Sequence, residues 1–82
     1  MIIVDIYVPA VGNTYDFQLD EDEKVGTLIE EIGELIGQKE HSRIEGDISK
    51  LMLCCCKDKK ILTKSMTLAD SGVQNGDSLI LV

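Results

Sequence analysis

The sequence predicts an α+β domain in which one helix covers one face of a mixed β-sheet. The hydrophobic pattern has the period of a strand at both ends of the chain and the period of a helix in one stretch between them. A short turn separates the first two predicted strands, which favours a hairpin. A chain of 82 residues is long enough for one small domain with a single modest core, and we expect residues 1–82 to form it.

The first two strands are predicted at residues 2–8 and 14–20. The first segment is rich in β-branched residues, which suit a pleated and half-buried surface. The second alternates strictly between apolar and polar side chains, with Phe17 in the middle of the apolar set. Gly12 and Asn13 lie between the two segments, and both tolerate a positive φ. The two strands therefore form the predicted hairpin.

A helix is predicted over residues 24–38, where apolar residues recur at steps of three and four. This stripe consists of Val25, Leu28, Ile29, Ile32, Leu35 and Ile36. The acidic residues 20–23 come just before it, where carboxylates suit the positive end of the helix dipole. Each glycine in the helix costs about 1 kcal/mol relative to alanine, so packing on the sheet must hold the helix in place. Residues 41–49, His41 included, show no clear period and are predicted to form a loop.

The C-terminal half is predicted to add three strands, at residues 50–56, 61–62 and 78–82. Residues 67–72 are predicted to form one helical turn with a glycine exit, and Asn75 and Gly76 a tight turn. The order is then β-β-α-β-β-β. A hairpin, one helix and further strands imply a mixed sheet with a helix on one face.

The net charge of -7 limits the classes of partner. Nucleic acid and anionic membranes are disfavoured, because both are bound by basic surfaces. The first residues lack the basic segment of a secretion signal, and the longest apolar run has six residues, from Leu51 to Cys56. The three cysteines are consecutive, unlike those of a secreted disulfide scaffold. We therefore expect a cytoplasmic protein without direct membrane insertion.

The order and spacing of the elements resemble ubiquitin and its β-grasp relatives. Within residues 62–82 the matching positions are Leu62, Thr67, Leu68, Asp70, Gln74, Leu79, Leu81 and Val82. The resemblance covers the whole chain, but only its last 15–20 residues approach a motif. It implies an α+β, ubiquitin-like β-grasp fold with a mixed five-stranded sheet in the order 2-1-5-3-4.

Within that superfamily, the segment from Leu68 to Leu79 resembles the YukD-like proteins, also called the EsaB family. These small, stand-alone ubiquitin-like proteins are encoded with type VII (WXG) secretion systems of Gram-positive bacteria. The resemblance implies a cytoplasmic accessory or regulatory component of such a system. Its partners would be cytoplasmic components of the secretion machinery.

The end of the sequence differs from that of conjugated ubiquitins and of ubiquitin-like sulfur carriers. Those proteins end in a flexible Gly-Gly tail, whereas this sequence stops at Val82, within the last predicted strand. Conjugation and sulfur transfer are therefore not expected, unless the natural chain extends beyond Val82. A modifier or sulfur carrier whose Gly-Gly tail is missing here is kept as an alternative.

No catalytic, metal or cofactor site is predicted. The acidic residues lack a nearby histidine that would complete a base and nucleophile, and no glycine-rich phosphate loop is present. Cys54, Cys55 and Cys56 do not have the spacing of a common zinc or iron–sulfur site. Ordinary strand packing explains them best, and a metal- or redox-responsive module is a further alternative. We expect a protein that is not an enzyme and has no cofactor.

The candidate functional site is the sheet face that turns away from the helix. If Leu79 and Leu81 face the helix, strand alternation places Ile80 and Val82 on the opposite face of the sheet. The same parity in the other strands gives an open face of Ile3, Tyr7, Met52, Cys54, Cys56, Ile80 and Val82. An apolar centre with a charged rim is typical of a protein-binding surface, and ubiquitin docks partners on the same face. The other two possibilities are scattered apolar exposure without function and a homodimer through this face.

Overall fold

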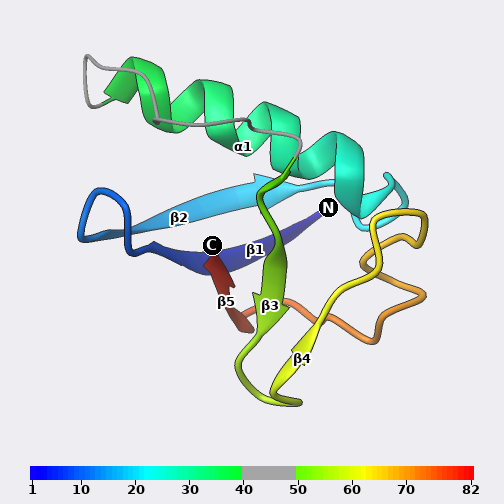
Figure 1. Ribbon diagram of the computed structural model, residues 1–82. Helices are drawn as coiled ribbons and strands as arrows, with labels where there is room; N and C mark the ends of the chain where they lie inside the picture. The colour runs from blue at the N-terminus through cyan, green and yellow to red at the C-terminus, as the bar shows by residue number, and fades with distance from the viewer. Residues whose placement is uncertain (40–49) are drawn as a thin grey trace.

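The computed structural model describes residues 1–39 and 50–82 and has the predicted architecture of a mixed sheet with one helix across one face (Figure 1). The strands are β1 (Ile2–Val8), β2 (Asn13–Leu19), β3 (Leu53–Cys55), β4 (Lys60–Ile61) and β5 (Ser78–Leu81), and the helix is α1 (Val25–Lys39). Their order in the sheet is β2-β1-β5-β3-β4. The first and last strands of the chain are parallel neighbours, and the other pairs are antiparallel. The fold is the predicted ubiquitin-like β-grasp, and the loop predicted at 41–49 lies outside the described residues.

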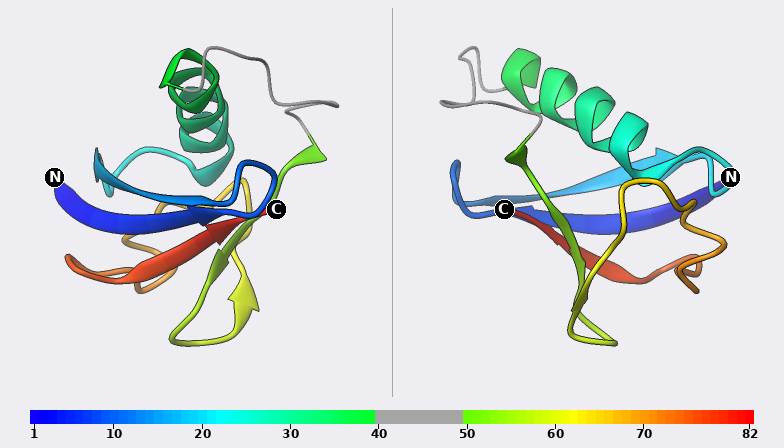
Figure 2. Two further views of the ribbon diagram at one scale, coloured as in Figure 1. Left: turned by 90° about the vertical axis from the view of Figure 1, so that its left-hand side faces the viewer. Right: turned by 45° about the vertical axis from the view of Figure 1, so that its right-hand side comes forward.

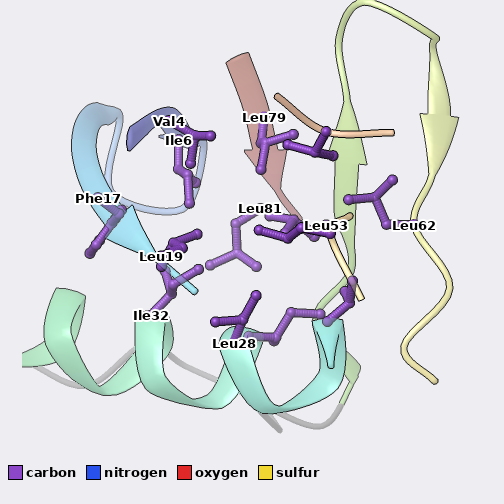
Figure 3. Packing of buried hydrophobic residues seen from close by; sticks show 14 of the residues in the cluster. Val4, Ile6, Phe17, Leu19, Leu28, Ile32, Leu53, Leu62, Leu79 and Leu81 are labelled. Atoms are coloured by element: carbon purple, nitrogen blue, oxygen red, sulfur yellow. The ribbon is translucent and has the colours of Figure 1, made fainter. Parts of the chain in front are cut away.

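The core lies between α1 and the sheet (Figure 3). Alternate strand residues point into it, among them Val4 and Ile6 of β1 and Leu79 and Leu81 of β5. The helix contributes Val25, Leu28, Ile29, Ile32 and Ile36, all at most 1% exposed. The predicted parity of these strands is therefore confirmed. The same alternation predicts Ile2 and Leu51 on the core side of their strands, but they are only partly buried at the edge of the core.

The helix prediction was wrong for Leu35, which is 43% exposed. Successive residues of an α-helix turn by about 100°, so Leu35 lies about 80° from Val25 around the axis, farther than the buried Leu28. The apolar stripe in the sequence is thus wider than the face that packs on the sheet.

The acidic residues 20–23 precede α1, as expected, and none of them falls in its first turn. The first helical amides are instead paired with backbone. Val25 donates to the Met66 carbonyl (2.8 Å) and Gly26 donates to the Lys64 carbonyl (3.0 Å). An ideal Cβ on Gly26 would lie 3.4 Å from Lys64 atoms, which is the near limit of ordinary van der Waals contact. A distant segment of the chain therefore fixes the start of the helix.

The third strand is shorter than predicted, because β3 covers Leu53–Cys55 rather than residues 50–56. Its pairing with the last strand nevertheless continues on both sides. Met52 and Val82 exchange two backbone hydrogen bonds (2.6 and 2.9 Å), and the Cys56 amide donates to the Ser78 carbonyl (3.1 Å). The bounds of β1 match the prediction, those of β2, β4 and α1 are shifted by one residue at both ends, and β5 ends one residue earlier than predicted.

The turn before β5 joins this strand to β1 and to the loop after β3. Gly76 has a φ of 88°, which favours glycine, and its amide donates to the Ile3 carbonyl (2.7 Å). Asp77 Oδ2 accepts hydrogen bonds from the Gln74 amide (2.8 Å) and from Lys57 Nζ (3.2 Å). The hydrogen bond from Gln74 is the main reason that the pKa of Asp77 lies below its ordinary value, and Lys57 adds to it.

Replacing Asp77 by alanine is expected to lower the melting temperature by several degrees at neutral pH. The variant loses both hydrogen bonds to the carboxylate, one of them from backbone. Thermal unfolding followed by circular dichroism measures the change, with Asp70→Ala in the same loop as the control. Equal melting temperatures for the two variants would contradict a structural role for the Asp77 carboxylate.

Candidate protein-binding surface

The sheet face opposite α1 is covered by no helix in the described part of the chain (Figure 2). On β1, the residues that alternate with the buried set are Ile3, Asp5 and Tyr7, and all three are exposed. The register of the neighbouring strands determines which side chains lie beside them. We call the surface made by these outward side chains the open face.

One row of side chains on the open face crosses the whole sheet. Tyr7 is opposite Thr14 of β2 on one side and Ile80 of β5 on the other. Ile80 is opposite Cys54 of β3, and Cys54 is opposite Ile61 of β4. Paired side chains on one face have Cβ atoms about 4.5–5.5 Å apart, so the row is continuous. We call these five residues the central row, and four of them are apolar or aromatic.

Further exposed side chains widen the central row along β5 and β3. Met52 and Val82 are paired through their two backbone hydrogen bonds and are 40% and 46% exposed. Cys56 is exposed on the other side of Cys54. Six of the seven predicted site residues therefore lie in the central row or beside it; their use as a binding site stays a prediction.

The remaining predicted residue, Ile3, is separated from the others by charge. Its cross-strand partner is Gln18, and Asp5 lies between Ile3 and Tyr7 on the same face of β1. Asp5 is opposite Asp16 of β2. Ile3 is exposed, but it does not continue the central row.

Ile61 is a member of the row that was not among the predicted residues. It is 58% exposed, whereas its neighbour Leu62 is buried. The short strand was predicted from the sequence, but no face was assigned to it. The similarity of Leu62 to a ubiquitin position, combined with strand alternation, was the signal that would have placed Ile61 on the open face.

The paired carboxyl groups of Asp5 and Asp16 form the charged side of the open face. The pKa of Asp5 is raised above its ordinary value of 3.8, first because Asp16 shares a hydrogen bond with it and second because the two charges repel. The folded protein thus binds more protons than the unfolded chain just above pH 3.8. The contribution of Asp5 to the free energy of unfolding therefore grows as the pH falls through its raised pKa, and it is absent at neutral pH.

Replacing Asp16 by asparagine is therefore expected to raise the melting temperature at pH 7. The variant removes one of two like charges that are directly opposite on neighbouring strands. The gain should shrink as the pH falls below the raised pKa of Asp5, because Asp5 is then protonated in the wild type and no longer repels Asp16. Thermal melts of both proteins across this pH range measure the difference, and an unchanged melting temperature at pH 7 would show that the repulsion is negligible.

The three cysteines are free and have three different environments. Cys55 is buried in the core, Cys54 is half-buried in the central row, and Cys56 is exposed. Within residues 1–39 and 50–82, no group of three or more histidine, cysteine, aspartate or glutamate side chains is placed to hold a metal ion. Nor does this part of the chain contain a helix that is long and apolar enough to cross a bilayer.

A comparison with models of protein families assigns the chain to a family. The family model for the WXG100 protein secretion system (Wss) protein YukD matches residues 1–81. The chain belongs to the YukD family. It is thus a ubiquitin-like protein of a secretion-system family. A search of curated proteins found no match.

Solved structures support the fold of this family member. One similar structure is the N-terminal ubiquitin-like domain in the 4931431F19Rik protein, with a TM-score of 0.72 and 22% identity, covering 99% of this chain and 72% of that chain. Another is the ubiquitin-like domain of Arabidopsis thaliana protein At2g32350, with a TM-score of 0.73 and 16% identity, covering 99% of this chain and 74% of that chain. Caldiarchaeum subterraneum ubiquitin is also similar, with a TM-score of 0.72 and 18% identity, covering 98% of this chain and 89% of that chain. Identities this low show a shared fold and leave the function to other observations.

Proposed function

We propose that this YukD family member is a non-enzymatic protein-binding module that serves a WXG100 secretion system as a cytoplasmic accessory or regulatory component. The family match supports the link to secretion. The open face supports the binding role, and the single observation that carries it is the central row. We propose that protein partners from the secretion machinery dock there.

The composition and extent of the row favour docking over chance exposure. Its apolar members come from four strands and are joined by direct cross-strand pairing, whereas chance exposure is usually scattered. Tyr7 adds an aromatic ring with a polar end, a side chain that is enriched at interfaces. The acidic pair at Asp5 and Asp16 gives the patch a charged rim on one side.

Affinity capture from the native cytoplasm tests the proposal, with Ile61→Asp as the variant. Ile61 is highly exposed on the open face, so the substitution leaves the core unchanged and places a charge at the end of the central row. The matched control is Leu35→Asp, which introduces the same charge at an exposed apolar position on α1. We expect a secretion-system protein to be captured by wild type and by the control, and to be lost with Ile61→Asp.

Two results would contradict the proposal. The first is retention of the same partner by Ile61→Asp together with its loss from Leu35→Asp, because the helix would then be the binding surface. The second is a captured set that contains no secretion-system protein. Circular dichroism of each variant confirms that it is folded.

A further inference from the structure

The charges of the open face are all of one sign. The strand residues on this face are Ile3, Asp5, Tyr7, Thr14, Asp16, Gln18, Cys54, Ile61, Ser78 and Ile80. They include two aspartates and no lysine or arginine. Lys60 of β4 is opposite the buried Cys55 and so belongs to the other face, and Lys57 is paired with Asp77 (3.2 Å). The strands thus supply no cation beside the acidic pair.

This distribution disfavours a second copy of the chain as the occupant. A dimer through the open face would bring together four carboxyl groups and no strand cation. Burying carboxylates without a partner charge is unfavourable, because their hydration is lost and no opposite charge replaces it. The net charge of -7 adds repulsion between copies.

The acidic pair is instead suited to a cation from a different protein. Asp5 and Asp16 are directly opposite on antiparallel strands, and the proximity of Asp16 raises the pKa of Asp5. Within the described residues, the N-terminus of Met1, Lys57 and Lys60 form ion pairs with other carboxylates and with neither of these aspartates. An arginine presents five N–H donors in a planar fork and can bond both carboxylates at once, which a single lysine ammonium does less well.

The acidic pair also adjoins the apolar part of the face. Asp5 precedes Tyr7 by two residues on β1, so the two side chains are neighbours on one face. Tyr7 is in turn opposite Ile80. A segment that crosses the sheet at this point meets two carboxylates and then an apolar surface.

We propose that the open face binds a protein segment in which an arginine lies next to apolar residues, with the guanidinium between Asp5 and Asp16 and an apolar side chain over Tyr7 and Ile80. This inference rests on the proposed function and names the chemistry of its partner. It makes the interface a heteromeric one.

Two synthetic peptides test the inference: acetyl-Leu-Arg-Leu-Arg-Leu amide, and the same peptide with citrulline in place of both arginines. Citrulline has nearly the shape of arginine but no charge. Each peptide is titrated at physiological ionic strength into the 15N-labelled protein, and backbone chemical shifts are followed. We expect the arginine peptide to shift the signals of Asp5, Tyr7 and Ile80 and to bind about tenfold more tightly than the citrulline peptide.

Two double variants with the same change in net charge provide the controls. Asp5→Asn with Asp16→Asn is expected to reduce the affinity for the arginine peptide about tenfold and to leave that for the citrulline peptide unchanged. Glu30→Gln with Glu34→Gln, at exposed positions on α1, is expected to keep wild-type affinity for both peptides. The spectra themselves report whether each variant is folded.

Several outcomes would overturn the inference, and they can be told apart from failure of the proposed function. Equal binding of both peptides to the open face would exclude specific recognition of arginine but would still support the open face as a docking surface. An equal loss in both double variants would indicate general attraction to an acidic protein. Shifts confined to α1, or no shift at millimolar arginine peptide, would also overturn it, whereas the docking role is decided separately by the capture experiment.

Discussion

Replacing Ile32 by alanine is expected to lower the free energy of unfolding by about 3 kcal/mol. Ile32 is fully buried on the side of α1 that packs on the sheet (Figure 3). The substitution removes three carbon atoms from a close-packed core and leaves a cavity that the fixed helix and strands cannot fill. For a domain of this size, the melting temperature should fall by more than about 10 °C.

Leu35→Ala is the matched control on the same helix. Leu35 is 43% exposed and its removal leaves no closed cavity, so we expect a loss below about 1 kcal/mol. Chemical denaturation of both variants measures the difference. Similar losses would mean that the face of α1 that packs on the sheet has been assigned wrongly.

Replacing Ile80 by aspartate is expected to weaken binding of the captured partner at least about 100-fold. Ile80 lies on β5 in the middle of the central row, between Tyr7 and Cys54. A charge here is buried without a partner when the interface forms, which costs several kcal/mol, and residues at the centre of an interface carry most of the binding energy.

Isothermal titration calorimetry with the purified partner measures this effect, with Leu35→Asp as the control at an exposed leucine. Because Ile80 is half-buried, the free energy of unfolding of Ile80→Asp is measured in parallel to establish that the variant is folded. A folded Ile80→Asp protein that binds with wild-type affinity would exclude the centre of the open face as the site.

Local patterns in the sequence were sufficient to predict the helix and the strands, but not the order of the strands in the sheet. Alternation in the first strand placed Val4 and Ile6 in the core and Tyr7 on the open face, because side chains of a strand alternate regardless of its neighbours. The helix was predicted to within one residue at each end by the spacing of its apolar residues. The order of the strands came from the resemblance to ubiquitin, since the local pattern alone does not determine it.

The composition of the candidate site depends on register, which the local pattern does not contain. That Ile61 is opposite Cys54, and that Asp16 is opposite Asp5, follows from pairing between strands whose positions are set by the whole fold. The exposure of Leu35 depends on which part of a wide apolar stripe meets the sheet. Likewise, the start of α1 is held by the carbonyls of Lys64 and Met66, which are far from it in the sequence, and no nearby residue signals this contact.

The most direct test of the central claim, that the open face is the protein-binding surface, is a cross-saturation measurement on the complex with the purified partner. The protein is deuterated except for its isoleucine and leucine methyl groups, and the protonated partner is irradiated. We predict that saturation reaches the methyl groups of Ile61 and Ile80 and spares that of Leu35 on α1. Saturation of Leu35, with Ile61 and Ile80 unaffected, would contradict the claim and assign binding to the helix.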